Sequence, residues 1–196
     1  ANNAKVVVLP TIAFGVNTGQ IDVSLCMNMN PSTQYAVLKD IVQVLDAQNI
    51  RKLVIVNGHG GNNFKQFIRE LSLVYPKVFI CSINWWQAAD YHPIFDEPGD
   101  HAGELETSAI MHLTPELVLP LSEAGSGSAK NFKVEGLKKG WVTAQRNWPS
   151  VTKDTGVGDP KLATKEKGAL FFDAAVAHIS KFLLELHDAQ LDDMYE

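Results

Sequence analysis

Apolar residues recur along the chain with two different spacings, which predict alternating strands and helices. Uninterrupted apolar runs within Lys5–Leu9, Lys52–Val56 and Val78–Ile83 are typical of strands covered on both faces. Between these runs, apolar residues return every three or four positions, as on one face of a helix. They are Val37, Leu38, Ile41 and Leu45 in the first predicted helix, and Phe64, Phe67, Ile68 and Leu71 in the second, which begins near Asn62.

Two more helices follow the third predicted strand. One begins near Glu104 and the last ends near residue 187, and their apolar faces carry Leu105, Ala109 and Leu113, then Phe172, Ala175, Val176, Ile179, Leu183 and Leu186. The pairs Asn30-Pro31 and Asp159-Pro160 read as a cap followed by the first helical position. The strand–helix alternation predicts an α/β fold with a mostly parallel central sheet. We expect a single domain over 1–196. The sequence begins without methionine and reaches a predicted buried strand at once, so we expect that an N-terminal segment is missing.

Composition narrows the function classes. The chain has 196 residues, 45% of them hydrophobic, which is enough for one sizeable core. Its net charge is −5 and no basic stretch is present, which excludes nucleic acid as an expected partner. No apolar run is long enough to predict a membrane span. Cys26 and Cys81 form neither a disulfide framework nor a metal-type pair, and Cys81 is predicted in the core. We expect a cytoplasmic protein.

The strand at Lys52–Val56 leads into a loop that holds a histidine among glycines. Residues 57–62 read Asn-Gly-His-Gly-Gly-Asn, which places His59 between a strand and a helix. In open α/β sheets, ligands bind at the carboxyl ends of strands. Gly60 and Gly61 allow close backbone approach and expose N–H groups to a ligand. A solvated or hydrogen-bonding histidine is the plainer interpretation. The loop lacks the Lys-Ser/Thr ending of a phosphate-binding P-loop.

A second histidine precedes the third helix. His101 lies three residues before Glu104, so both side chains could face one point and support metal or acid–base chemistry. The alternative for Glu104 is an ordinary helix-stabilising acid in the first turn. Glu106 lies about 200° around the helix from Glu104 and is expected either to support a site residue or to have a structural partner.

Two further residues lie where a substrate could bind. Trp86 follows the third strand and could line a pocket, although a core position or an oligomer contact explains it equally well. Asp22 lies in a long connection, 11–31, and long connections in compact domains are often functional. A turn-capping aspartate is the simpler interpretation of Asp22.

Three motifs together resemble the creatininase (creatinine amidohydrolase) family. They are Val56–Asn62, Asp100–Ser108, and Gly158–Pro160 with Ala163–Gly168. The resemblance implies a three-layer α/β/α fold and a hydrolytic site with two divalent metals per full-length chain, zinc, manganese or iron. It also implies cleavage of non-peptide C–N bonds in cyclic amides or formamides, and a homohexamer.

The resemblance also implies residue roles. His59 resembles a metal ligand, Glu104 the carboxylate ligand of the subgroup with a His-Gly-Gly-Asn loop, and His101 the catalytic histidine that gives a proton to the leaving nitrogen. Gly60 and Gly61 stand where creatinine-hydrolysing members carry tyrosine and a carboxylate, so we expect another small-molecule amide as substrate. Residues 1–31 do not match the family's Glu-x-His and Asp ligands, which are expected upstream of residue 1.

The resulting hypothesis is a metal-dependent amidohydrolase that uses a metal-activated water. The alternative is a catalytically inactive family member that binds a small molecule or serves as an oligomer subunit. A weaker third hypothesis is a phosphate or nucleotide binder that uses the glycine-rich loop around His59.

Overall fold

The computed structural model describes residues 4–196, which divide into two compact units that we describe one at a time. Within the described residues, the first unit comprises 4–18, 27–88 and 177–196, and the second comprises 19–26 and 89–176. The single domain expected over 1–196 stays a prediction. The structure combines helices with a parallel sheet, which confirms the predicted α/β class.

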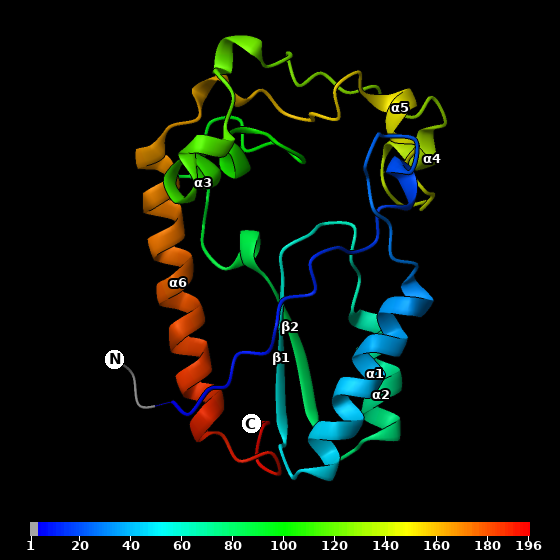
Figure 1. Cartoon of the computed structure of the whole chain (residues 1–196), viewed down its shortest axis with the longest axis vertical. Helices are drawn as coiled ribbons and strands as arrows, with labels where there is room; N and C mark the ends of the chain where they lie inside the picture. The colour runs from blue at the N-terminus through cyan, green and yellow to red at the C-terminus, as the bar shows by residue number, and fades with distance from the viewer. Residues whose placement is uncertain (1–3) are drawn as a thin grey trace. The chain divides into compact units, whose positions relative to one another are not determined.

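A pair of parallel strands forms the centre of the first unit. Strands β1 (Lys52–Asn57) and β2 (Phe79–Asn84) pair in register from Lys52–Phe79 to Asn57–Asn84. Helices α1 (Pro31–Ala47) and α2 (Lys65–Val74) lie side by side near them (Figure 1). This confirms the predicted helix–strand–helix–strand order and brings the carboxyl ends of both strands to one edge.

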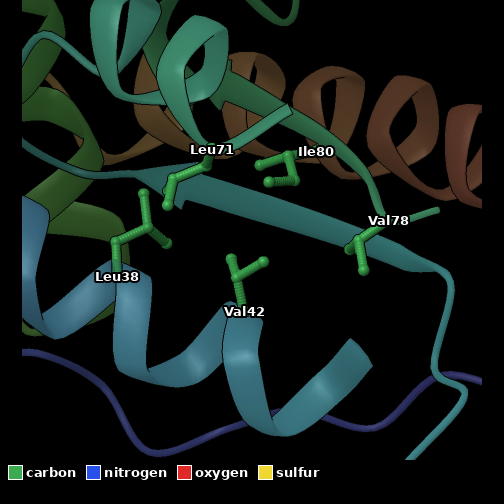
Figure 2. Packing of buried hydrophobic residues seen from close by; sticks show 5 residues of the cluster. All are labelled: Leu38, Val42, Leu71, Val78 and Ile80. Atoms are coloured by element: carbon green, nitrogen blue, oxygen red, sulfur yellow. The ribbon is translucent and has the colours of Figure 1, made fainter. Parts of the chain in front are cut away.

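The core of the first unit lies between the two helices and the strands. Its buried members come from α1, α2, β2 and the residue before β2, and they point toward one another (Figure 2): Leu38, Val42, Leu71, Val78 and Ile80. Val42 and Leu71 are completely buried. Burying one aliphatic side chain stabilises a fold by about 1.5–3 kcal/mol, so this cluster holds both helices against the strands.

The last helix, α6 (Lys165–Asp188), ends in the first unit. The Nζ of Lys52, at the start of β1, donates to the carbonyl oxygens of Leu186, His187 and Ala189, at 2.6, 3.1 and 2.7 Å. The last carbonyls of a helix have no partner within the helix, and a lysine supplies them with donors and a favourable charge.

The second unit is built around α3 (Glu104–Leu113) and the first part of α6. Ser108 of α3 is completely buried and its Oγ accepts from the backbone N–H of Thr164, which fixes the start of α6. A side chain at Gly168 would collide with the carbonyl of Ser108, so the glycine allows α6 to lie close to α3.

The remaining elements are short. The second unit also holds the short helices α4 (Glu135–Lys138) and α5 (Trp148–Val151). Across both units, single 3₁₀ turns occupy Thr18–Gln20, Trp85–Gln87, Pro115–Leu117, Leu121–Glu123 and Pro160–Leu162. None of the helices within residues 4–196 has the length and apolarity that crossing a bilayer requires.

The strand predicted at Lys5–Leu9 is wrong. Residues 4–10 have no regular secondary structure, and Val7 and Val8 are 85% and 88% exposed. Consecutive β-branched residues favour an extended backbone, but a strand forms only when a neighbour accepts and donates its hydrogen bonds. The prediction for the second strand was correct in position, although Val56 is 59% exposed rather than covered on both faces.

One predicted helix cap and two predicted helix starts also need correction. Asn30 makes no capping bond to α1, although Pro31 is the first helical residue as predicted. Helix α2 begins at Lys65 rather than near Asn62, and the backbone N–H of Lys65 donates to the side chain of Asn63. Asp159 accepts from Lys161 N–H at 3.0 Å and so caps a 3₁₀ turn, whereas α6 itself begins only at Lys165.

Candidate functional site

Buried asparagines hold the His59 loop at the carboxyl ends of the strands. Asn57, the last residue of β1, is 2% exposed. Its Oδ1 accepts from the backbone N–H of His59 at 3.1 Å and from Asn62 Nδ2 at 3.0 Å. Its Nδ2 donates to Asn84 Oδ1, at the end of β2, at 2.9 Å. The two strand ends and both ends of the loop therefore share one hydrogen-bond network.

The same network ties the loop to an earlier part of the chain. Asn62 Oδ1 accepts from the backbone N–H of Val16 at 3.0 Å and from Gln34 Nε2 at 2.9 Å. Gln34 is buried, so its amide is held without competition from water. The loop is thus fixed by hydrogen bonds whose partners lie in three separate segments.

The ring of His59 is held in one tautomer. Its Nε2 lies 3.0 Å from the carbonyl oxygen of Val16, and since a carbonyl can only accept, Nε2 carries the proton and donates. Nδ1 then keeps its lone pair, and no residue within 4–196 hydrogen-bonds to it. A metal-binding histidine commonly donates its second ring N–H to a backbone carbonyl in this way. The geometry leaves Nδ1 able to bind a metal.

The glycines of this loop differ in how much room surrounds them, which gives a matched test. A Cβ at Gly61 would overlap the Val16 carbonyl and lie 2.5 Å from His59 Nε2, whereas a Cβ at Gly60 would meet no atom within 4 Å. We expect Gly61→Ala to displace His59 and Gly60→Ala to leave it in place. NMR shifts of the imidazole of His59 should therefore change in the first variant. Equal shifts in both variants would contradict this arrangement.

In the second unit, His101 is held by a strand-like pairing with a later loop. Its backbone N–H donates to the Val157 carbonyl at 3.1 Å, and the N–H of Val157 donates back at 2.8 Å. The imidazole Nδ1 lies 2.9 Å from the carbonyl oxygen of Thr155 and must be the donor. Trp148 packs on the ring, with centroids 4.9 Å apart. Nε2 is therefore the atom at which His101 can exchange a proton.

The carbonyl that orients His101 comes from a strained residue. Thr155 has φ +68°, a left-handed conformation that is costly for a β-branched side chain. A tight turn holds it: the hydroxyl of buried Thr152 donates to the Gly156 carbonyl at 2.9 Å, and Asp154 Oδ1 accepts from Gly156 N–H at 3.2 Å. The turn thus aims the Thr155 carbonyl at the imidazole.

Glu104 is completely buried and both of its carboxylate oxygens are engaged. Oε1 forms an ion pair with Nζ of Lys167 on α6, and Oε2 accepts from the backbone N–H groups of Asp96 and Glu97 at 3.0 and 2.8 Å. The hydrogen bond to Glu104 raises the pKa of Lys167. Glu106 accepts from Ala102 N–H at 2.7 Å, the structural partner expected for it.

The predicted residues are divided between the two units. His59, Gly60, Gly61 and Trp86 belong to the first unit, whereas Asp22, His101 and Glu104 belong to the second. Trp86 is half-buried in the turn that follows β2. Asp22 is exposed in a turn and makes no hydrogen bond or ion pair with any residue in 4–196. Trp148, Thr155 and Lys167 were not predicted as site residues. Two local signals were present: the turn-like Asp154-Thr155-Gly156, and the motif Ala163–Gly168 that contains Lys167.

Comparison with known proteins identifies the family. The creatinine amidohydrolase (creatininase) family model matches residues 1–183. The chain belongs to the creatininase family. One similar crystal structure is that of a protein from Bacteroides fragilis described as a candidate creatinine amidohydrolase. Its sequence is 41% identical to this one and its fold gives a TM-score of 0.84, over 93% of this chain and 71% of that chain.

More distant relatives share the creatininase fold or part of the sequence. A creatininase variant with creatine bound has a TM-score of 0.69 at 20% identity, over 90% of this chain and 74% of that one. The mycofactocin precursor peptide peptidase of Mycobacterium tuberculosis is 33% identical over 129 residues, 64% of this chain and 45% of that protein. The chain therefore spans about half the length of this curated relative.

We tested whether the residues of this creatininase-family chain suit the metals of the family. Within residues 4–196, no three His, Cys, Asp or Glu side chains lie together as a metal site would require. His59 suits the role of one ligand through Nδ1. The carboxylate of Glu104 is already occupied by Lys167 and two N–H groups. The described residues therefore do not form a complete metal site.

Proposed function

We propose that this chain acts in a metal-dependent amidohydrolase that cleaves a non-peptide C–N bond, in a cyclic amide or a formamide. The observation that supports it best is the fixed tautomer of His101, whose Nδ1 donates to Thr155 and whose Nε2 stays available. Membership of the creatininase family supports a hydrolytic reaction, and solved creatininases at 20% identity include a manganese form and a Zn–Zn form.

His101 would act as the proton donor to the leaving nitrogen. A protonated imidazole that donates to Thr155 through Nδ1 carries its second proton on Nε2. Giving that proton to the departing amine avoids expulsion of an amide anion. The Thr155 carbonyl keeps the ring in the same orientation before and after the transfer.

His59 and Glu104 remain the proposed metal ligands of this chain, in a full-length protein that holds two metals. A bound divalent metal would supply an activated water. His59 would bind through Nδ1, whereas Glu104 could bind only after Lys167 releases Oε1. Gly60, Gly61, Trp86 and Asp22 are proposed substrate contacts. The cytoplasmic location and the homohexamer are part of the same proposal.

The engagement of Glu104 favours a second candidate function. A carboxylate that is buried and paired with lysine is typical of a structural role, so the chain could be a non-catalytic member that binds a small molecule or serves as an oligomer subunit. The name of the mycobacterial relatives also raises a peptide bond as the bond cleaved. Both candidates differ from the main proposal in measurable ways.

Metal content tests the proposal directly. Elemental mass spectrometry on the full-length protein under metal-replete conditions should find about two divalent metals per chain. His59→Ala should lose metal, whereas His92→Ala, which changes an exposed histidine paired with Asp90, should keep it. A full-length protein without stoichiometric metal would reject the hydrolytic proposal and favour the non-catalytic one. Tight phosphate binding that survives chelation would instead favour a phosphate binder.

A further inference from the structure

An arginine lies beside the proposed proton donor in the second unit. The Cζ of Arg146 lies 4.0 Å from the centroid of the Trp148 ring, and the imidazole of His101 also packs on that ring, with centroids 4.9 Å apart. The guanidinium and the imidazole are therefore within about 9 Å of each other, on a shared aromatic platform. This places a permanent positive charge in the neighbourhood of the imidazole that would protonate a leaving group.

The charge of Arg146 is only partly used. Its Nη1 donates to Asp100 Oδ2 at 2.5 Å, and its other N–H groups have no partner within residues 4–196. A guanidinium presents five N–H donors in a fork that fits a carboxylate bidentately. The side chains of Arg146 and Asp100 are 36% and 57% exposed, so water screens their pairing and its contribution is small. An anion can bind the open donors or replace Asp100 at little cost.

The platform, which is the indole ring of Trp148, is held rigidly enough to act as a binding surface. Asn147 Oδ1 accepts from Ser150 N–H at 3.0 Å and caps the turn that carries Trp148. On the other side, a Cβ at Gly19 would collide with the Arg146 carbonyl and lie 2.9 Å from Trp148 Cδ1. Glycine at this position lets the 19–26 segment pack directly on the platform. Stacking on Trp148 restricts the orientation of the guanidinium before a ligand binds.

We propose that Arg146 is a specificity-determining residue that binds a carboxylate on the leaving-nitrogen side of the substrate. This inference rests on the proposed function, because it assigns His101 to the leaving nitrogen. Because the guanidinium and the imidazole are at most about 9 Å apart, one small substrate can contact both groups. The carboxylate must then lie close to the leaving nitrogen, and an α-carboxylate is the nearest one that an amine nitrogen carries. The substrate class is therefore an N-acyl or N-formyl α-amino acid.

Two probes of equal size but different charge test this inference. N-formylglycine carries the carboxylate and N-formylglycinamide is its neutral counterpart. We expect the metal-replete full-length protein to bind N-formylglycine about 10- to 100-fold more tightly, since hydrogen bonds between charged groups are the strong ones. NMR of the Trp148 indole N–H, assigned with Trp148→Phe, reports binding at the platform itself. Equal affinities, or no shift of this signal by millimolar N-formylglycine, would overturn the inference.

Variants separate anion binding from a merely structural ion pair. Arg146→Gln should remove the preference for the charged probe, and Asp100→Asn should strengthen it by freeing Nη1. Arg51→Gln is the matched control, since Arg51 also pairs with an aspartate, Asp46, at 2.5 Å and is 30% exposed. A lost preference in the Arg51 variant, or a retained one in the Arg146 variant, would contradict the assignment.

Hydrolysis distinguishes this inference from the function on which it rests. If neutral formamides are hydrolysed and Arg146→Gln does not change the choice between the two probes, the proposed function holds and the carboxylate assignment is wrong. If the charged probe binds through Arg146 but neither probe nor any amide is hydrolysed by the metal-loaded protein, the carboxylate site stands and the hydrolytic function is wrong.

Discussion

Replacement of His101 by alanine is expected to lower the turnover of an amide substrate by about 10²- to 10⁴-fold while bound metal stays unchanged. The imidazole is held by the Thr155 carbonyl at 2.9 Å and has Nε2 as its one atom for proton exchange. Without it, the leaving nitrogen must take its proton from water. Steady-state kinetics together with metal analysis of the same samples measures both effects.

The pH profile makes this prediction specific to proton donation. An acid must be protonated to act, so the wild-type rate should fall on the alkaline side and this limb should be missing from the residual activity of His101→Ala. His92→Ala serves as the control, because His92 is exposed and its side-chain contacts are the pairing with Asp90 and the stacking on Tyr91. Unchanged kcat in His101→Ala would remove the histidine from the mechanism, and loss of metal would make it a ligand instead.

Replacement of Glu104 by alanine is expected to reduce the free energy of unfolding by about 1–3 kcal/mol, the usual cost of leaving buried hydrogen-bonding groups without a partner. Lys167 is 26% exposed, so water can solvate its ammonium once the carboxylate is gone. The carboxylate is completely buried and joins α3 to Lys167 of α6 and to the backbone at Asp96 and Glu97. Urea unfolding measures the change. Glu106→Ala removes a carboxylate two residues away that accepts a single N–H, and it should cost far less.

The ion pair also predicts a dependence on pH. The pKa of Lys167 is raised above its usual value of 10.5, mainly by the hydrogen bond to Glu104. The contribution of the pair is therefore fully present below pH 10.5 and is lost as the pH rises through the higher folded-state pKa. A small effect of Glu104→Ala on unfolding, together with complete loss of metal, would show that Glu104 is a ligand rather than an anchor.

The periodic parts of the sequence predicted the fold well. Helices α1, α2 and α3 and strands β1 and β2 lie where the apolar spacing placed them, because burial of one face fixes both the type and the position of an element. The strand predicted at Lys5–Leu9 failed for a physical reason. Its residue types favour an extended chain, but pairing depends on a neighbour that no local pattern specifies.

The candidate site residues were chosen from the sequence, but their partners in the fold were not. His101 and Glu104 stood out as a histidine and an acid at a loop–helix boundary. The carbonyl of Thr155 lies 54 positions from His101, and the ammonium of Lys167 lies 63 positions from Glu104. These partners are set by tertiary folding, so the sequence could not show that one histidine is fixed in a tautomer and that one carboxylate is already occupied.

The contact between Lys52 and the end of α6 has a consequence for how the chain folds during synthesis. The carbonyls that accept from Lys52 lie 134 to 137 positions later in the chain. They belong to residues 177–196, the last segment of the first unit. A ribosome adds about 5–20 residues per second, so β1 is made many seconds before its last partner emerges. Residues 89–176 of the second unit are complete earlier. The later-made unit can therefore fold before the first unit gains its contacts between Lys52 and the end of α6.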